Sequence, residues 1–158
     1  MANTQSMTTS FMGELMTATH NFGTAPIRAA TTADTFKAAL YLTSATVNAA
    51  TTAYSSTNEV TGTGYTAGGV TVTNATAPIA TNSSATAGVA YWTPSASITY
   101  TPVTLSTAFD AVLIYNSSQS NKAVSVHTFG SQTITAGTFT LTMPSNTTTT
   151  ALLRLSTT

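Results

Sequence analysis

The stretch Ala111-Val112-Leu113-Ile114-Tyr115 is an unbroken apolar run in a chain of 158 residues. A continuous run of this length, bounded by polar residues, is typical of a β-strand that is buried on both faces. A membrane-spanning helix would need about 20 such residues, and no run in the sequence approaches that length. The stretch therefore predicts a strand that has protein packed against both of its sides.

Shorter strand-like segments occur before and after this run. Residues 36–42 (FKAALYL) predict a strand, and residues 70–73 (VTVT) alternate with a period of two, as a half-exposed strand does. Clusters of Gly, Pro, Asn and Ser separate the segments, and such clusters favour turns. The remaining predicted strands cover residues 91–92, 98–103, 123–129, 138–143 and 151–155. Short strands with regular turn signals predict an all-β fold, a β-sandwich or jelly-roll-like single domain.

The N-terminal part of the chain has a different pattern. Residues 1–10 are polar and predict a flexible arm. Ser10 can cap a short helix in which Phe11 and Leu15 fall at helical spacing, and Gly23 can end it. We therefore divide the chain into an N-terminal arm and short helix, residues 1–23, and a β-sandwich domain, residues 24–158.

Two low-complexity stretches lie between the predicted strands. Residues 43–57 and 74–88 are rich in Ala, Thr, Ser and Asn and lack large apolar residues. Without such residues a segment has little to anchor it in a core, so both stretches predict long surface loops.

The composition excludes several classes of function. The chain holds 39 Thr and 17 Ser, but only four Lys or Arg and four Asp or Glu. Charged residues are 5% of the total, whereas an average soluble domain has about a quarter. Four cations cannot form the basic surface that nucleic acids or anionic membranes require. With 42% apolar residues and no charge repulsion, the chain suits a subunit of an assembly, and Thr suits the outer face of its sheets.

No targeting or redox signal is visible in the sequence. The first ten residues lack the basic and apolar regions of a signal peptide, which favours synthesis in a cytoplasm. Cys is absent, so neither disulfides nor thiolate metal sites can form.

The residues that could perform chemistry are few and scattered. His20 and His127 each lack a second ligand at metal-binding spacing. Asp34 and Asp110 precede predicted strands and are expected to bond local backbone N–H groups, while Glu59 lies in a third turn. Along residues 123–129 a regular strand would place Val124 and Val126 on one face and Ser125 and His127 on the other. We therefore expect the His127 imidazole to face solvent or an interface. We predict that the protein is not an enzyme, with no catalytic residue, metal or cofactor.

The glycine-rich residues 62–69 (GTGYTAGG) have neither the spacing nor the Lys of a phosphate-binding loop. Turns with positive φ and close backbone approach at a strand start are the better interpretation. The aromatic residues allow two interpretations, which are packing in a core or interface and a platform for carbohydrate. The residues concerned are Tyr54, Tyr65, Tyr91, Trp92 and Tyr100.

Two motifs carry a resemblance to a known family. They are residues 35–42 (TFKAALYL) and 58–70 (NEVTGTGYTAGGV), followed at similar spacing by residues 109–116, 127–130 and 137–141. This pattern, over roughly residues 34–155, resembles a widespread family of small virion structural proteins of tailed bacteriophages. The resemblance implies a virion component more firmly than it implies which component.

Composition and resemblance together predict a non-enzymatic virion structural protein. We expect a capsid cement or decoration protein that bridges major capsid subunits, assembles as a homotrimer, and binds neither nucleic acid nor membrane. The alternatives are a tail or fibre component that contacts the host surface and a carbohydrate-binding adhesive module. The predicted contact residues form an apolar, Met-containing cluster made of Phe11, Met12, Leu15, Met16 and Phe22.

Overall fold

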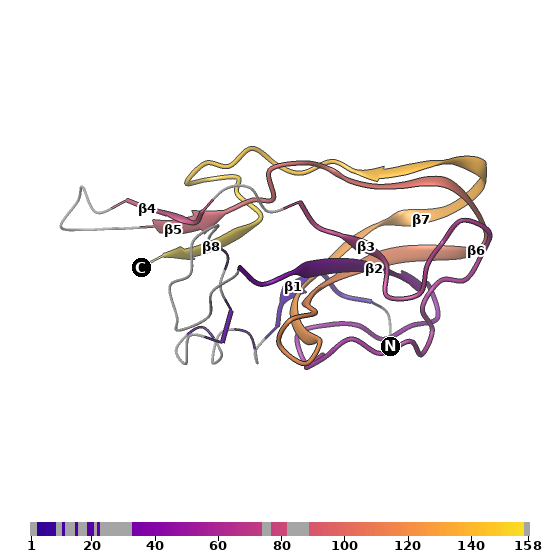
Figure 1. The fold of residues 1–158 in the computed structure, drawn as a ribbon, viewed down its shortest axis with the longest axis horizontal. Coiled ribbons are helices and arrows are strands. Elements are labelled where there is room, and N and C mark those ends of the chain that lie inside the picture. The colour runs from indigo at the N-terminus through magenta and orange to yellow at the C-terminus, as the bar shows by residue number, and fades with distance from the viewer. Residues whose placement is uncertain are drawn as a thin grey trace.

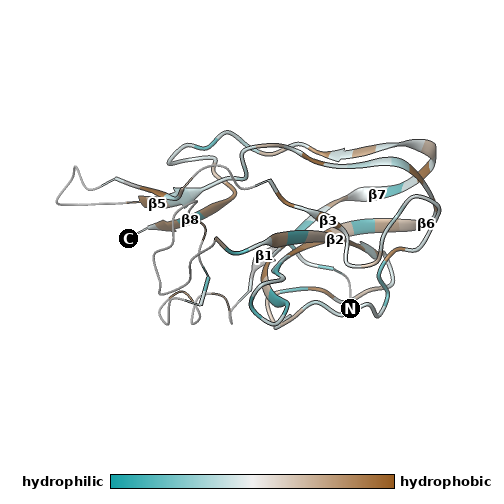
Figure 2. Ribbon diagram, viewed as in Figure 1, coloured by the Kyte–Doolittle hydropathy of each residue, from teal (hydrophilic) through white to brown (hydrophobic). Residues whose placement is uncertain are grey.

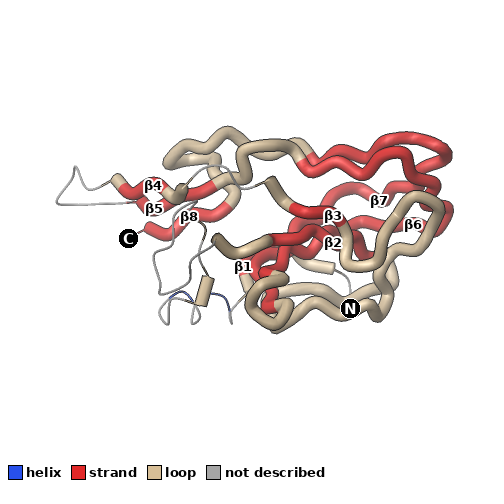
Figure 3. The backbone as a smooth tube through the Cα atoms, in the orientation of Figure 1, coloured by secondary structure: helices blue, strands red, loops and turns tan. Residues whose placement is uncertain are grey.

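Two antiparallel sheets make up the described part of the computed structural model, which covers residues 3–8, 11, 15, 19–20, 22, 33–73, 77–81 and 89–156. The five-stranded sheet has the order β1 (Ser6–Met7), β7 (Lys122–Leu141), β6 (Ile98–Asn116), β2 (Phe36–Leu42) and β3 (Val70–Thr71). The three-stranded sheet has the order β4 (Ile79–Ala80), β5 (Val89–Trp92) and β8 (Leu153–Ser156), and it lies at one end of an elongated molecule (Figure 1). Figure 3 shows strands and loops with almost no helix, so the all-β, β-sandwich-like prediction is confirmed.

The two layers of the sandwich come largely from one ribbon. Strands β6 and β7 pair along their whole length, but the register shifts repeatedly between Tyr100 and Ala111. Such bulges bend a strand and increase its twist, and the ribbon turns back at the right-hand end of Figure 1. The hydroxyl of Tyr100 donates to the carbonyl of Ala38 on β2 at 2.8 Å, which joins the two layers through the core.

The length of this ribbon differs from the prediction. The predicted strands 98–103 and 111–115 are parts of β6, and 123–129 and 138–143 are largely parts of β7. Gly130 and Gly137 were expected to end strands, but both lie inside β7 near the bend. Glycines are common at bent or bulged strand positions, and the Thr and Ser residues between the apolar segments fit an exposed pleated surface.

The apolar run at the centre of the sheet is buried on both faces, as predicted. Val112 and Ile114 belong to the main core, while Leu113 and Tyr115 belong to a second core on the opposite face. The three aliphatic side chains are 0% exposed, and each such burial is favourable by about 1.5–3 kcal/mol before entropy is counted.

The second face is covered by residues 43–57, which corrects the prediction of an unanchored surface loop. Ala45 and Val47 are 1% and 6% exposed and pack in the second core. The hydroxyl of Tyr41 donates to the carbonyl of Ser55 at 2.5 Å and holds the loop against β2. Small side chains suffice here because the loop lies directly on the sheet.

The prediction that Val124 and Val126 lie on the same face of the strand is wrong. Ser125 pairs with Ile114 while Ala123 pairs with Tyr115, so Val124 is the extra residue of a bulge. The bulge places Val124 in the main core and Val126 in the second core. A one-residue offset of this kind exchanges the faces of all later side chains.

The glycine loop, residues 59–69, connects the two layers. A Cβ added at Gly62 would lie 2.1 Å from the carbonyl oxygen of Thr104 in the upper ribbon, and one at Gly69 would lie 1.6 Å from that of Ala38 in β2. Gly69 also has a φ of 71°. The predicted turns and close backbone approach are therefore confirmed.

The outer face of the ribbon carries threonine, as the composition predicted. Thr99 and Thr140 lie directly across from one another with hydroxyl oxygens 3.3 Å apart, and those of Thr101 and Thr138 are 2.6 Å apart. Figure 2 shows bands of apolar and more polar residues alternating along this ribbon. Threonine hydroxyls thus supply the groups that hydrogen-bond water on a surface without charged side chains.

The N-terminal segment, residues 3–22, packs against the sheet. Strand β1 pairs with β7, and Thr8, Phe11 and Phe22 are buried. Phe11 and Leu15 are helical, whereas Thr19, His20 and Phe22 are not, and the other residues of the predicted helix lie outside the described residues. The division at residue 23 stays a prediction, although described residues before it share the core of the sheet.

Candidate functional site

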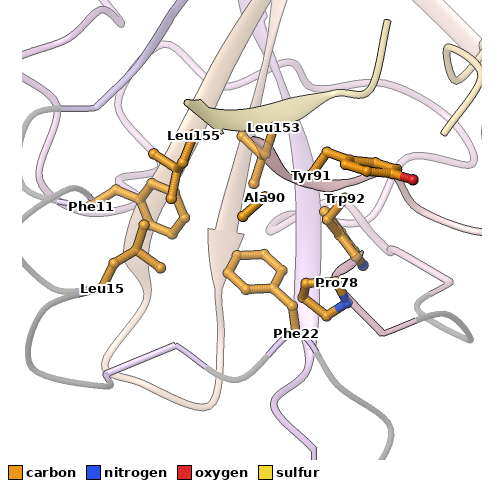
Figure 4. A pocket seen from close by; sticks show the side chains of 9 residues that line it. All are labelled: Phe11, Leu15, Phe22, Pro78, Ala90, Tyr91, Trp92, Leu153 and Leu155. Carbon is orange, nitrogen blue, oxygen red and sulfur yellow. The ribbon is translucent and has the colours of Figure 1, made fainter. Parts of the chain in front are cut away.

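An apolar pocket of about 90 Å³ lies between the N-terminal segment and the three-stranded sheet (Figure 4). Pro78 precedes β4, and the side chain of Leu155 on β8 is 45% exposed at the rim. The lining residues are Phe11, Leu15, Phe22, Pro78, Ala90, Tyr91, Trp92, Leu153 and Leu155. Three of the predicted contact residues therefore surround one pocket, while Met12 and Met16 lie outside the described residues.

The aromatic rings form the inner wall of this pocket. Phe22 stacks on Phe36 with ring centroids 4.6 Å apart, and the Trp92 ring lies 4.8 Å from Phe22 and 6.2 Å from Phe36. Phe11 meets Phe22 edge-on at 5.7 Å. Because Phe11 and Phe22 are 1% and 7% exposed, they shape the pocket from within. The surface open to a partner comes from the half-buried and exposed lining residues, which are Leu15, Pro78, Ala90, Tyr91 and Leu155.

A buried polar cluster fixes the N-terminal segment behind the pocket. The side-chain amide of Asn116 donates to Asp34 Oδ2 at 2.8 Å and lies 3.0 Å from His20 Nδ1. Gln119 donates to the other oxygen of Asp34 at 3.1 Å. These two partners of Asp34 are distant side chains, which the sequence did not predict.

Glu59 holds the glycine loop in shape. Its carboxylate accepts hydrogen bonds from the hydroxyls of Tyr54 and Tyr65 at 2.6 and 2.7 Å and from the backbone N–H of Gly68 at 2.7 Å. The hydroxyl of Tyr65 also accepts from the N–H of Leu40 on β2 at 3.0 Å. The motif that carries the family resemblance is thus a structural bridge between layers, which the sequence alone did not reveal.

The third described carboxylate also joins distant segments. The side-chain amide of Asn3 donates to Asp110 Oδ1 at 2.5 Å and to the carbonyl of Leu42 at 3.2 Å. Asp110 was expected to bond backbone nearby, and the contact with Asn3 ties the N-terminal segment to β6 instead. Pairing across more than a hundred positions of sequence cannot be predicted from local patterns.

The aromatic residues are used for packing. Trp92 and Tyr100 are 2% exposed, Tyr65 stacks on Tyr100 at 5.9 Å, and Tyr54 stacks on Tyr115 at 4.7 Å. Burial raises the pKa of the Tyr100 hydroxyl, which is bonded within the core. The five side chains form two groups, since Tyr54, Tyr65 and Tyr100 gather around the glycine loop whereas Tyr91 and Trp92 line the apolar pocket.

His127 is half-buried on β7, and the expectation that its imidazole faces solvent or an interface stays a prediction. Its Nε2 is 2.9 Å from the hydroxyl oxygen of Ser125. Burial lowers the pKa of His127 to about 4, so the ring is neutral at pH 7. The Ser125 side chain is 1% exposed.

The described residues offer little else for a metal or a membrane. No group of three or more His, Cys, Asp or Glu side chains comes together among them. Within the same part of the chain, no helix has the length and apolar character needed to cross a bilayer. The apolar pocket is lined by groups that can contact an apolar side chain.

Comparisons with protein-family models, with curated proteins and with solved structures returned no match to this chain.

Proposed function

We propose that this protein is a non-enzymatic structural subunit of a bacteriophage virion, a capsid cement or decoration protein that bridges major capsid subunits. The apolar pocket between the N-terminal segment and the three-stranded sheet carries the proposal. It supports docking because its rim exposes Leu155 on a chain that has few charges to repel a neighbour. The resemblance of residues 35–42 and 58–70 to small phage virion proteins supports the same role.

In this proposal the partner is a major capsid protein, and binding works by burial of surface. A protruding apolar side chain of the partner enters the pocket and contacts Leu15 and Leu155. The Thr-lined ribbon remains on the outside and keeps the decorated particle wettable. The subunit acts as a homotrimer at positions of local three-fold symmetry, and it needs no nucleic acid, membrane or cofactor.

Localisation on the particle is the first test. Virions that carry labelled protein are imaged by negative-stain microscopy. Label spread over the head supports the cement role. Label confined to the tail or its fibres supports the alternative of a host-contacting component, and absence from particles overturns both.

The pocket itself is tested with a charge inserted at its rim. Leu155→Asp is compared with Thr133→Asp, which adds the same charge at an exposed position of β7 away from the pocket. Binding is measured by sedimentation with particles that lack the protein. Loss of binding in Leu155→Asp alone supports the proposal, and equal binding by both variants removes the pocket from it. Light scattering of the parent protein tests the trimer, which a strictly monomeric species would refute.

A further inference from the structure

A second cavity, of about 370 Å³, lies where the N-terminal segment, β7 and β8 meet. Gln5 comes from the N-terminal segment, Ser125 and His127 from β7, and Leu152 and Arg154 from the C-terminal residues. It is separate from the aromatic wall of the apolar pocket, and nothing in the proposed virion role uses it.

The polar groups around this cavity are hydrogen-bond donors with few internal partners. Arg154 is exposed, and its one described hydrogen bond is a long one of 3.4 Å to the carbonyl of Thr148. The side-chain amide of Gln5 is exposed and makes no hydrogen bond to the described residues. A guanidinium has five N–H donors and no acceptor, so most of the donor capacity at Arg154 is open.

His127 adds a further polar atom to the wall. Its Nε2 is taken by the hydroxyl of Ser125 at 2.9 Å, and its Nδ1 has no hydrogen bond within the described residues. When the hydroxyl donates to Nε2, the ring proton of the neutral imidazole is on Nδ1, which then donates. In that tautomer His127 can offer a second donor.

No described acidic residue lines the cavity. The carboxylates of Asp34, Glu59 and Asp110 are each bonded elsewhere in the fold. The cavity therefore presents one cation and neutral donors without a compensating anion. Ala151 and Leu152 supply an apolar part of the wall.

We propose that this cavity binds a carboxylate group. The planar guanidinium of Arg154 pairs with the two carboxylate oxygens, and Gln5 and His127 donate further hydrogen bonds as neutral groups. One guanidinium matches the single charge of a carboxylate and its two oxygens. A phosphate dianion would leave charge uncompensated, and a cation would face Arg154 with no acidic ligand. The apolar wall fits a short hydrocarbon attached to the carboxylate.

The same chemistry has two sources, a free organic acid and an acidic side chain of a protein. We therefore titrate the full-length protein with propionate and, separately, with the blocked peptide acetyl-Ala-Glu-Ala-amide, following the ¹H–¹⁵N signals of the protein by NMR. The neutral peptide acetyl-Ala-Gln-Ala-amide is the ligand control. We expect saturable shifts with a Kd on the order of 1 mM for at least one carboxylate and none for the neutral peptide.

Arg154→Gln is the diagnostic variant, because its side chain is exposed and its removal should not disturb folding. Lys122→Gln, which removes an equal charge at the start of β7, is the matched control. Loss of saturable binding in Arg154→Gln with retention in Lys122→Gln supports the site. Saturation by propionate identifies a free acid as sufficient, and saturation by the acidic peptide alone identifies a protein partner. No saturable shift with either probe, or equal binding by both variants, overturns the proposal.

Discussion

Removal of the Glu59 carboxylate should destabilise the protein more than any other single carboxylate removal among the described residues. The side chain is 6% exposed and accepts three hydrogen bonds of 2.6 to 2.7 Å. In Glu59→Ala, the hydroxyl of Tyr65 and the N–H of Gly68 lose their acceptor, and each orphaned buried donor costs about 1–3 kcal/mol. Tyr54 is only half-buried, so its hydroxyl can bond water instead.

Relief of the buried charge offsets part of this loss, because a desolvated carboxylate is itself unfavourable. We therefore expect Glu59→Ala to lower the free energy of unfolding by about 3 kcal/mol, a large fraction of the 5–15 kcal/mol typical of a domain. Glu59→Gln should cost about 1 kcal/mol or less. Its carbonyl can replace Oε1, which accepts from both Tyr65 and Gly68, and its amide can donate to the Tyr54 hydroxyl.

Urea unfolding measures these differences. The chain has a single Trp, and Trp92 is 2% exposed, so its fluorescence reports loss of the core. Asp110→Ala is the control, since that carboxylate has one described side-chain donor, Asn3, and is half-buried. An unchanged m-value would show that only stability is altered. The reasoning is refuted if Glu59→Ala costs no more than Asp110→Ala, or if Glu59→Gln is as damaging as Glu59→Ala.

Three further predictions follow from the packing. Gly69→Ala should destabilise by more than about 3 kcal/mol or prevent folding, because the new Cβ would overlap the Ala38 carbonyl at a positive φ; Gly130→Ala, with nothing within 4 Å of the new Cβ, should be nearly neutral in the same urea assay. The free energy of unfolding should fall by up to about 3 kcal/mol as the pH drops from 6.5 to 4. The reason is that the folded-state pKa of His127 lies below its unfolded value, so the unfolded chain binds the proton first. His127→Gln should flatten this pH dependence, and an unchanged slope in the variant would contradict the prediction. Deletion of residues 1–22 should weaken or abolish folding, since their described apolar side chains fill the core; a truncated protein with the parent's circular dichroism and urea midpoint would restore the independent arm predicted from the sequence.

The sequence predicted those elements whose signal is local. Residues 36–42 were placed correctly because an apolar segment between turn residues has few alternatives, and β2 has those bounds. The buried run at 111–115 was recognised from continuity alone. The glycine-rich residues 62–69 were recognised as turns, and Gly64, Gly68 and Gly69 have the positive φ that such turns require.

The errors concern features that depend on partners far along the chain. The bulge at Val124 exists because two strands must bend together, and no residue of the segment marks it. The roles of Asp34 and Asp110 depend on Asn116 and Asn3, which lie 82 and 107 positions away in the sequence. Glu59 differs, because its side-chain partners Tyr54 and Tyr65 lie five and six positions away. The sequence predicted only one side of the candidate pocket, for the same reason. The apolar cluster of the N-terminal segment was visible, but β8 and β5, which complete the pocket, lie more than sixty positions away.

The use of charge in this chain explains how so few ionisable residues suffice. Each described carboxylate accepts hydrogen bonds from other side chains of the chain, so charge serves internal cohesion instead of dispersal in solvent. Solvent contact is left to threonine, whose hydroxyls pair across the ribbon between Thr99 and Thr140 and between Thr101 and Thr138. A hydroxyl surface is wettable, but it imposes no long-range repulsion on a neighbouring copy or partner. A protein built in this way approaches other subunits without an electrostatic barrier, and its specificity must then come from shape and from apolar contacts such as those at the Leu155 rim.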